Sequence, residues 1–316
     1  MKKSSVALTC ALALLTASPF VLAQNEGEGQ GQAIITALPK QNNAPPADIP
    51  QQDVVVQVNG KKTEIANWQA LRGPNAPVEL VILIDDGARA SLGREFDDIT
   101  HFVQSLPPNV KIAFAYMENG RAVMAAPLSA DHAKVLQQIH LPIGGAGISA
   151  SPYFCLSDLA KRWPSEDRTA RREVVMISDG VDRYELRYDP DDPYVHAAID
   201  DSARAGLVVY SIYWRGDGRI DRTGYENNAG QNLLLAVTQA TGGNSYWEGM
   251  GNPVTLQPYF DDLSRRLNNQ FELGFTAPLH GKAQVESLKV KVNDSSVKVT
   301  APQQSFVAPG GTNAQR

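Results

Sequence analysis

Cysteine is nearly absent from this sequence, which has two cysteines, Cys10 and Cys155, among 316 residues. Cys10 lies in an amino-terminal segment that we expect to be removed, so Cys155 would remain alone and no intramolecular disulfide could form. Apolar residues flank Cys155 at helical spacing, and no histidine lies near it in the sequence. We therefore interpret Cys155 as a small buried hydrophobic residue, with a reactive thiol as the less favoured alternative.

Positive charge and histidine are also in short supply. Lysine and arginine number 29 against 34 acidic residues, which gives a formal net charge of −5, and the basic residues are scattered. The five histidines form no His-x-x-x-His pair, and Ser178 lacks the glycine frame of a nucleophile elbow. We therefore expect no nucleic-acid partner and no enzymatic activity, with a hydrolase as a remote alternative.

The first 23 residues have the layout of a secretory signal peptide. Lys2 and Lys3 precede an uncharged apolar stretch at 6–17, and Val-Leu-Ala at 21–23 is typical of a cleavage site. The apolar stretch is too short to cross a bilayer comfortably, and lipid attachment at Cys10 would require cleavage inside it. We expect a secreted chain, periplasmic or extracellular, with no transmembrane segment in its mature form.

Composition and patterning divide the rest of the chain into five parts. A stretch rich in Gln, Asn, Gly and Pro predicts a flexible linker, and Asn59-Gly60 between two β-prone runs predicts a hairpin. The predicted parts are a linker at 24–52, a β-hairpin segment at 53–72, a main domain at 76–270, a carboxyl-terminal β segment at 271–302 and a disordered tail at 303–316.

Two apolar runs in the main domain each end in acidic residues. Residues 78–84, apolar except for Glu79, lead into Asp85-Asp86-Gly87, and the four apolar residues 174–177 lead into Ser178-Asp179-Gly180. Runs without alternation fit strands that are covered on both faces. Because open α/β sheets bind ligands at the carboxyl ends of their strands, we expect Asp85 and Asp179 to lie together at one rim.

Strand and helix patterns alternate through the main domain. This alternation predicts an α/β fold with a doubly wound, mostly parallel sheet and helices on both faces. The amino-terminal hairpin and the carboxyl-terminal strands would add a small β appendage. The strands of the main sheet are expected at 78–84, 110–116, 172–178, 207–213 and 244–247.

The acid-terminated strands carry a resemblance to a known family. A hydrophobic strand followed by Ser178-Asp179-Gly180 and a further acid at Asp182 resembles the fourth strand of a von Willebrand factor A domain, which is Rossmann-like. The strand that ends at Asp85 resembles that domain's first strand, and the resemblance implies an antiparallel edge strand at 121–126. A last helix that runs into Leu-Gly-Phe at 273–275 resembles a secreted bacterial subgroup of the family.

The resemblance also implies a degenerate metal site. In that family, two serines of an Asp-x-Ser-x-Ser motif, a threonine from a middle loop and the Asp of Ser-Asp-Gly hold a divalent metal ion. Here Gly87 and Arg89 stand at the serine positions of a motif that begins Asp85-Asp86, and Ala146 stands at the threonine position. We therefore expect no cofactor. The alternative is a Mg²⁺- or Ca²⁺-dependent adhesion module in which Asp86 replaces a lost serine.

Arg89 offers a substitute for the missing cation. Two neighbouring carboxylates without a cation repel each other or raise a pKa. The planar fork of an arginine pairs well with a carboxylate, so we predict that Arg89 lies within about 4 Å of Asp85 or Asp179 and neutralises it. The competing interpretation is an arginine that points into solvent.

Two long loops should rise from the same rim, at 181–195 and 214–228. Aromatic residues among Arg and Asp on such loops favour a protein-recognition surface, although the loops could instead fold over their own aromatics. The residues predicted to bind a protein partner are Tyr184, Tyr188, Tyr194, Trp214 and Tyr225.

Other acidic clusters fit known sites poorly. Asp189, Asp191 and Asp192 lack regular calcium-ligand spacing, which favours a solvated turn. A phospho-receiver domain would need a third strand-end Asp, and a dehalogenase-type phosphatase would need an Asp where Gly87 stands. The sequence therefore predicts an exported, non-catalytic protein-binding or scaffold module.

Overall fold

The computed structural model describes most of the chain. The described residues are 27–41, 44–73, 76–145, 147–185, 189, 191–216, 224–249, 251–279 and 281–310. The expected signal peptide and two predicted site residues, Ala146 and Tyr188, lie outside them.

One of two sheets is a six-stranded mixed sheet in the order β10-β9-β8-β5-β6-β7. Five of its strands are parallel, and β7 runs antiparallel to β6 at one edge. The edge strand expected from the family resemblance is thereby confirmed. The strands are β5 (Val78–Asp85), β6 (Val110–Glu118), β7 (Arg121–Met124), β8 (Arg171–Ser178), β9 (Leu207–Tyr213) and β10 (Ser245–Tyr246).

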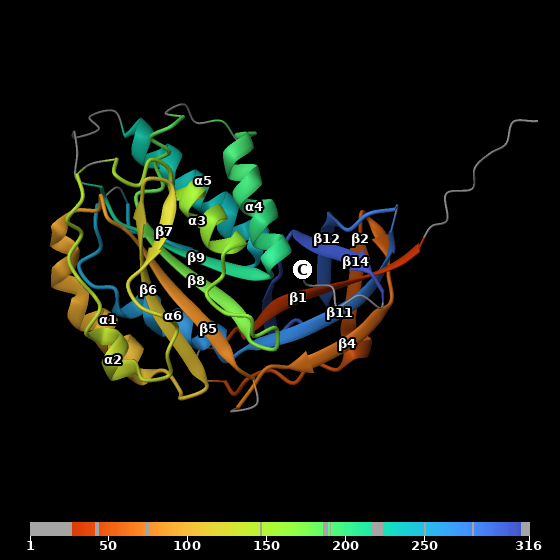
Figure 1. The fold of residues 1–316 in the computed structure, drawn as a ribbon. Helices are drawn as coiled ribbons and strands as arrows, with labels where there is room; N and C mark the ends of the chain where they lie inside the picture. The colour runs from red at the N-terminus through yellow and green to blue at the C-terminus, as the bar shows by residue number, and fades with distance from the viewer. Residues whose placement is uncertain are drawn as a thin grey trace, which may run out of the picture.

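Helices cover both faces of this sheet (Figure 1). On one face, Phe102 of α1 stacks on Phe260 of α6 with ring centroids 4.5 Å apart. On the other face, α3 contributes Cys155, which is fully buried among apolar side chains as the sequence predicts. The first group is α1 (Phe96–Ser105), α2 (His132–Leu136) and α6 (Gln257–Leu267), and the second is α3 (Pro152–Lys161), α4 (Pro193–Ala205) and α5 (Tyr225–Thr241).

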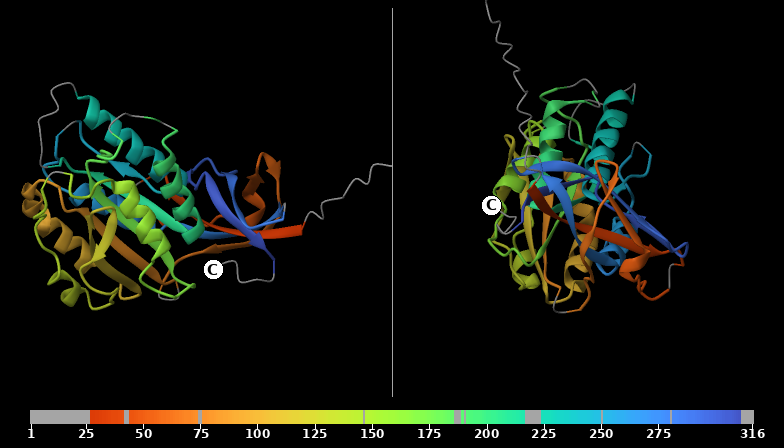
Figure 2. Two further views of the ribbon diagram at one scale, coloured as in Figure 1. Left: turned by 45° about the horizontal axis from the view of Figure 1, so that its top comes forward. Right: turned by 90° about the vertical axis from the view of Figure 1, so that its right-hand side faces the viewer.

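The second sheet has eight antiparallel strands and lies beside the first (Figure 2). Seven strands follow the order β3-β2-β12-β14-β1-β11-β4, and β13 pairs with β1. These strands are β1 (Gly27–Pro39), β2 (Val54–Val58), β3 (Lys61–Lys62), β4 (Ile65–Ala70), β11 (Gln270–Leu279), β12 (Gln284–Val292), β13 (Val297–Thr300) and β14 (Gln304–Pro309).

The predicted fold class is therefore wrong. The chain is not one doubly wound, mostly parallel sheet with a small β appendage, because the antiparallel sheet is the larger of the two and has its own core. This arrangement could not be predicted from local sequence patterns, because the antiparallel sheet is assembled from the two ends of the described chain. These ends are far apart in the sequence and pair only in the folded protein.

The predicted linker is the clearest single error. Residues 27–39 form β1, which pairs with β11, β13 and β14. Two of its glycines face bulky cross-strand neighbours: a Cβ on Gly31 would lie 2.4 Å from the ring of Phe275, and one on Gly29 would lie 2.6 Å from Val307. The partner strands thus supply the apolar bulk that the first half of β1 lacks. The predicted tail is wrong in the same way over β14.

The hairpin at Asn59-Gly60 is confirmed. Both residues have positive φ, 49° and 76°, as a tight two-residue turn of this kind requires. The turn joins β2 to β3, which pair antiparallel.

The two sheets meet around the start of β11. The side-chain amide of Gln270 donates to Glu173 of β8 at 2.9 Å and to Tyr210 of β9 at 3.3 Å. Arg171 donates to the carbonyls of Leu71 and Leu267. These contacts connect the amino-terminal end of the mixed sheet to the antiparallel sheet. Within the part of the chain that the structure describes, no helix is both long and apolar enough to cross a membrane.

Candidate functional site

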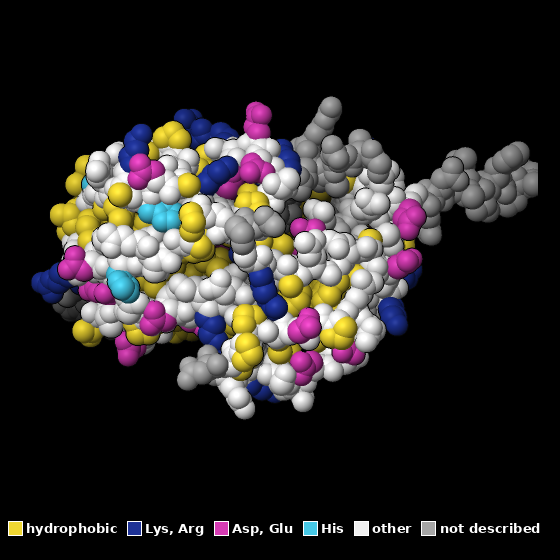
Figure 3. Space-filling model, turned by 90° about the horizontal axis from the view of Figure 1, so that it is seen from below, with side chains coloured by type: hydrophobic (Ala, Val, Ile, Leu, Met, Phe, Trp, Pro, Cys, Tyr) yellow, Lys and Arg dark blue, Asp and Glu magenta, His cyan; other side chains and the backbone are white. Residues whose placement is uncertain are grey.

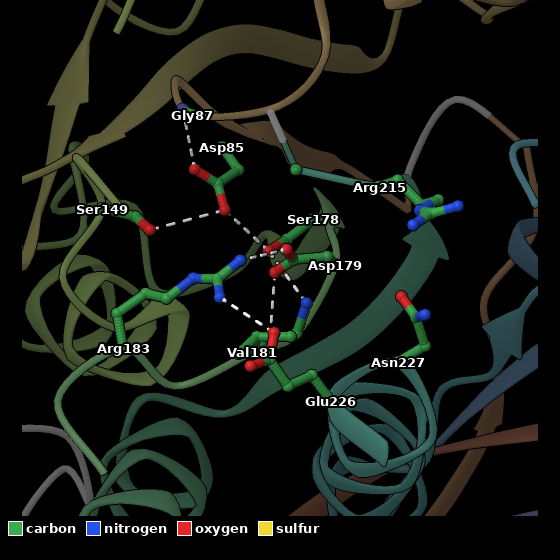
Figure 4. A network of polar contacts seen from close by, with 12 residues as sticks. Asp85, Gly87, Ser149, Ser178, Asp179, Val181, Arg183, Arg215, Glu226 and Asn227 are labelled. Atoms are coloured by element: carbon green, nitrogen blue, oxygen red, sulfur yellow. Dashed lines mark hydrogen bonds and ion pairs between the residues drawn. The ribbon is translucent and has the colours of Figure 1, made fainter. Parts of the chain in front are cut away.

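The two strand-end acids lie at one rim, as predicted. β5 and β8 pair in register up to Ile84 and Ile177, so Asp85 and Asp179 follow at the same end of the sheet. Figure 4 shows both carboxylates in one polar network, with Ser178 between them. Asp85 and Asp179 are each largely buried, at 4% and 7% exposure.

Hydrogen bonds surround the Asp85 carboxyl group. Its Oδ1 accepts from the Gly87 amide at 2.9 Å, and its Oδ2 accepts from the hydroxyls of Ser178 at 2.9 Å and Ser149 at 3.4 Å. Burial, and next the negative charge of Asp179, raise the pKa of Asp85 to about 7, against the lowering effect of these donors. The Asp85 carboxyl group therefore titrates near neutral pH.

Arg183 neutralises the second acid. Its guanidinium donates to Asp179 Oδ2 at 3.0 Å, and its other terminal nitrogen lies 3.4 Å from Glu226 Oε2 (Figure 4). The Val181 amide donates to Asp179 Oδ1 at 2.9 Å. Burial raises the pKa of Asp179, and the positive charge of Arg183 is the largest opposing influence. Both oxygens of Asp179 are thus engaged within the chain.

The prediction that Arg89 pairs with one of the two acids is wrong. An arginine does pair with Asp179, but it is Arg183. Arg89 Nε donates to the Gly216 carbonyl at 3.2 Å, and among the described residues no carboxylate lies within 4.0 Å of its guanidinium. Arg183, four residues after Asp179, makes the expected contact instead. The sequence offered a signal, since Arg183 lies three residues after Gly180 of the Ser-Asp-Gly turn, but loop geometry decided which arginine reaches the acid.

Asp86 and the glycine-rich loop form a separate arrangement. Asp86 Oδ1 accepts from the Ile143 amide at 3.0 Å, and its carbonyl accepts from Gly144 at 3.1 Å. A Cβ on Gly87 would lie 3.1 Å from the Gly145 carbonyl, so the Asp85-Asp86-Gly87 turn packs directly on this loop. Asp86 therefore binds the backbone of the glycine-rich loop through both its side chain and its carbonyl.

The described polar groups at this rim are engaged with one another. A guanidinium lies against Asp179, and the hydroxyls near Asp85 donate their protons to its carboxylate. Within the described ranges, no group of three His, Cys, Asp or Glu side chains is placed to hold a metal. Of the acids considered for calcium, Asp192 caps α4 by accepting from the amides of Tyr194 and Val195.

The predicted aromatic residues divide into two groups. Trp214 is buried at 2% exposure, and its indole nitrogen donates to the Arg89 carbonyl, so its prediction as a contact residue is wrong. Tyr184 is 64% exposed and Tyr225 52% exposed. Tyr194 lies edge-on to Tyr184, with ring centroids 5.3 Å apart, and both rings pack on Phe154 of α3.

Sequence reasoning missed three further residues of this rim. Ser149 supplies a hydroxyl to Asp85, Ser151 supplies one to Asp182 at 3.0 Å, and Arg183 binds Asp179. Ser149 and Ser151 follow the glycine-rich loop, and their contacts depend on where that loop crosses the end of β5. No sequence spacing known to us encodes them.

No model of a known protein family matches the chain, and no curated protein matches it. Among solved structures, the chain is similar to an aerotolerance-related membrane protein from Bacteroides fragilis NCTC 9343 and to the conserved hypothetical protein BatB from Bacteroides thetaiotaomicron. Each has a TM-score of 0.44 and 16% identity, over 60% of this chain and 98% of that chain. It is also similar to the VWA domain of SpRpn10, with a TM-score of 0.38 and 14% identity over 60% of this chain and 94% of that one. Because these TM-scores are below 0.5, the likenesses carry no argument about function.

Proposed function

We propose that this chain is an exported, non-catalytic protein-binding module in which an internal arginine replaces the metal ion of a von Willebrand A-type rim. The Arg183–Asp179 ion pair carries the proposal. At 3.0 Å from Asp179 Oδ2, the guanidinium stands where a cation would otherwise offset two buried acids. Because Asp85 and Asp179 both bind other groups of the chain, the rim would act as a surface for protein recognition rather than as a reactive site.

Exposed aromatic side chains beside the ion pair support the recognition role. Tyr184 directly follows Arg183, and Tyr225 directly precedes Glu226, which completes the Arg183 pair. Aromatic residues at the edge of a rigid polar network are typical contact anchors, because they bury much area at low entropic cost. The partner-binding surface would thus comprise Tyr184, Tyr194 and Tyr225.

Calorimetric titration with Mg²⁺, Ca²⁺ and Mn²⁺ tests the arginine replacement. The wild-type chain should show no saturable heat with any of the three ions, because Arg183 occupies the position beside Asp179. Arg183→Ala should expose the acid pair and gain weak binding, whereas Arg162→Ala, at a surface ion pair with Asp158, should not. Saturable binding by the wild type would contradict the proposal.

Partner capture from an envelope extract tests the surface. Replacing Tyr184, Tyr194 and Tyr225 with alanine should reduce the captured amount at least tenfold while the protein still melts cooperatively. The control replaces Trp247 and Val254, two exposed apolar residues of another loop, and should capture like the wild type. Equal capture by the triple variant would exclude this surface.

A metal-dependent adhesion module is the second candidate. It is favoured by the hydroxyls of Ser149 and Ser178, which surround Asp85 although the expected hydroxyl positions are lost. The same calorimetric titration separates the two candidates, since only this one requires the wild type to bind a cation.

A further inference from the structure

A cleft of about 280 Å³ lies between the two sheets, on the side opposite the acidic rim. It is bordered by the amino-terminal end of β8, the carboxyl-terminal ends of α4 and α5, and strands β1, β11 and β14. Figure 1 shows the end of α4 approaching the antiparallel sheet here. We refer to this space as the inter-sheet cleft.

The charge in the inter-sheet cleft is one-sided. Among the described residues, its lining includes Arg168, Arg171, Arg172 and Arg204 but only one carboxylate, Glu272. None of the four arginines has a carboxylate within 4.0 Å in the described part of the chain, and Glu272 accepts from Asn67 instead. This is unusual for a chain of net charge −5, whose face seen in Figure 3 carries interspersed charges of both signs.

Two of these arginines have a structural explanation. Arg171 donates to the carbonyl of Leu267 at the end of α6, and Arg172 donates to the carbonyl of Ala205 at the end of α4. Such contacts satisfy carbonyls that helix ends leave unpaired. Even so, Arg171 Nε is buried without a hydrogen-bond partner. Both guanidiniums therefore make their hydrogen bonds to neutral carbonyls, and the acids that act on them, Glu173 for Arg171 and Glu79 and Asp167 for Arg172, lie outside the cleft lining.

The other two arginines have no such explanation. Arg168 and Arg204 line the cleft and are exposed, and the guanidinium carbon of Arg204 lies over the ring of Phe306, 5.3 Å from its centroid. Arg204 makes no ion pair with Asp200, one turn earlier on α4, in the structure as described. Burial, and next the positive charge of Arg168, lower the pKa of Arg172, and the negative charges of Glu79 and Asp167 oppose this shift. An anion between the two guanidiniums would relieve their repulsion.

We propose that the inter-sheet cleft binds a small oxyanion ligand, bearing a phosphate or carboxylate group, through Arg168 and Arg204. A guanidinium group can donate two parallel hydrogen bonds to either a phosphate or a carboxylate. Arg171 and Arg172, which also line the cleft, add positive electrostatic potential. The side-chain amides of Gln32 and Gln69 also line the cleft and can orient the rest of the ligand. The volume is near the lower limit of small-molecule sites, which excludes a folded partner.

Isothermal titration of the full chain with inorganic phosphate, pyrophosphate and citrate, at constant ionic strength, tests the proposal. At least one of the three should bind saturably below about 10 mM, since a Kd of 1 mM requires only about −4 kcal/mol. Arg168→Gln combined with Arg204→Gln should weaken that binding at least tenfold. Because neither side chain is buried, the double variant should melt at the wild-type temperature.

A control variant that loses the same amount of positive charge distinguishes binding in the cleft from a general electrostatic attraction of anions to the protein. Lys61→Gln combined with Lys62→Gln removes two positive charges on β3, outside the cleft lining, and should leave the affinity unchanged. Equal weakening by this control would overturn the proposal, as would the absence of saturable binding by all three probes. The metal titrations of the rim are independent of either result.

Discussion

At the scale of single residues, the Arg183–Asp179 contact explains how a buried acid is tolerated. Replacing Arg183 with alanine leaves Asp179 almost buried without its cation, so the free energy of unfolding should fall by about 1–3 kcal/mol, after allowance for the partial exposure of Arg183. Urea denaturation measures this change. Arg162→Ala, which removes an exposed arginine from its pair with Asp158, should cost less than about 1 kcal/mol. An equal loss of unfolding free energy in the two variants would show that the Arg183–Asp179 pair stabilises the fold no more than a surface ion pair does.

The pH dependence of stability should report on Asp85. Its pKa rises from 3.8 to about 7 on folding, so between these values the folded state binds more protons than the unfolded state. The stabilisation is complete below the unfolded pKa and is lost as the pH rises through about 7. Relative to Asp85→Asn, the wild-type free energy of unfolding should therefore fall with rising pH, by on the order of 1 kcal/mol per unit. Parallel pH profiles for the two proteins would contradict this assignment.

At the scale of elements, β1 depends on glycine because its partners fill the space above it. A side chain at Gly31 would collide with the ring of Phe275. Gly31→Val should lower the free energy of unfolding by about 1–3 kcal/mol, as expected for overpacking. Gly27→Ala, where a Cβ meets nothing within 4 Å, is the matched control and should be nearly neutral. Chemical denaturation of both variants distinguishes local collision from a general glycine effect.

At the scale of the whole molecule, Gln270 connects the two sheets. Gln270→Ala removes the donor that serves Glu173 and Tyr210, so both buried groups lose a partner and the free energy of unfolding should fall by about 1–3 kcal/mol. Asn67→Ala, which removes a partly buried contact to Glu272 within one sheet, should cost less. If unfolding monitored by tryptophan fluorescence and by far-ultraviolet circular dichroism gives the same cost for both, the connection does not stabilise the junction.

The sequence by itself determined the strands of the mixed sheet and the position of its acids. Short apolar runs that end in turn residues favour strands covered on both faces, and parallel pairing brings Asp85 and Asp179 to one end of the sheet whatever the loops do. The Asn59-Gly60 turn is equally local, because positive φ at both positions is a property of those two residues. Burial of Cys155 also followed from its own neighbours.

Only the tertiary structure decided the larger sheet and the charge pairing at the rim. Residues 27–32, the first half of β1, lack an apolar pattern of their own because Phe275 and Val307, far away in the sequence, fill the space above Gly31 and Gly29. Arg183 rather than Arg89 reaches Asp179, and Trp214 turns inward, because packing of the loops sets side-chain direction. Residue type fixes which contacts are chemically favourable, whereas the path of the backbone determines which of them form.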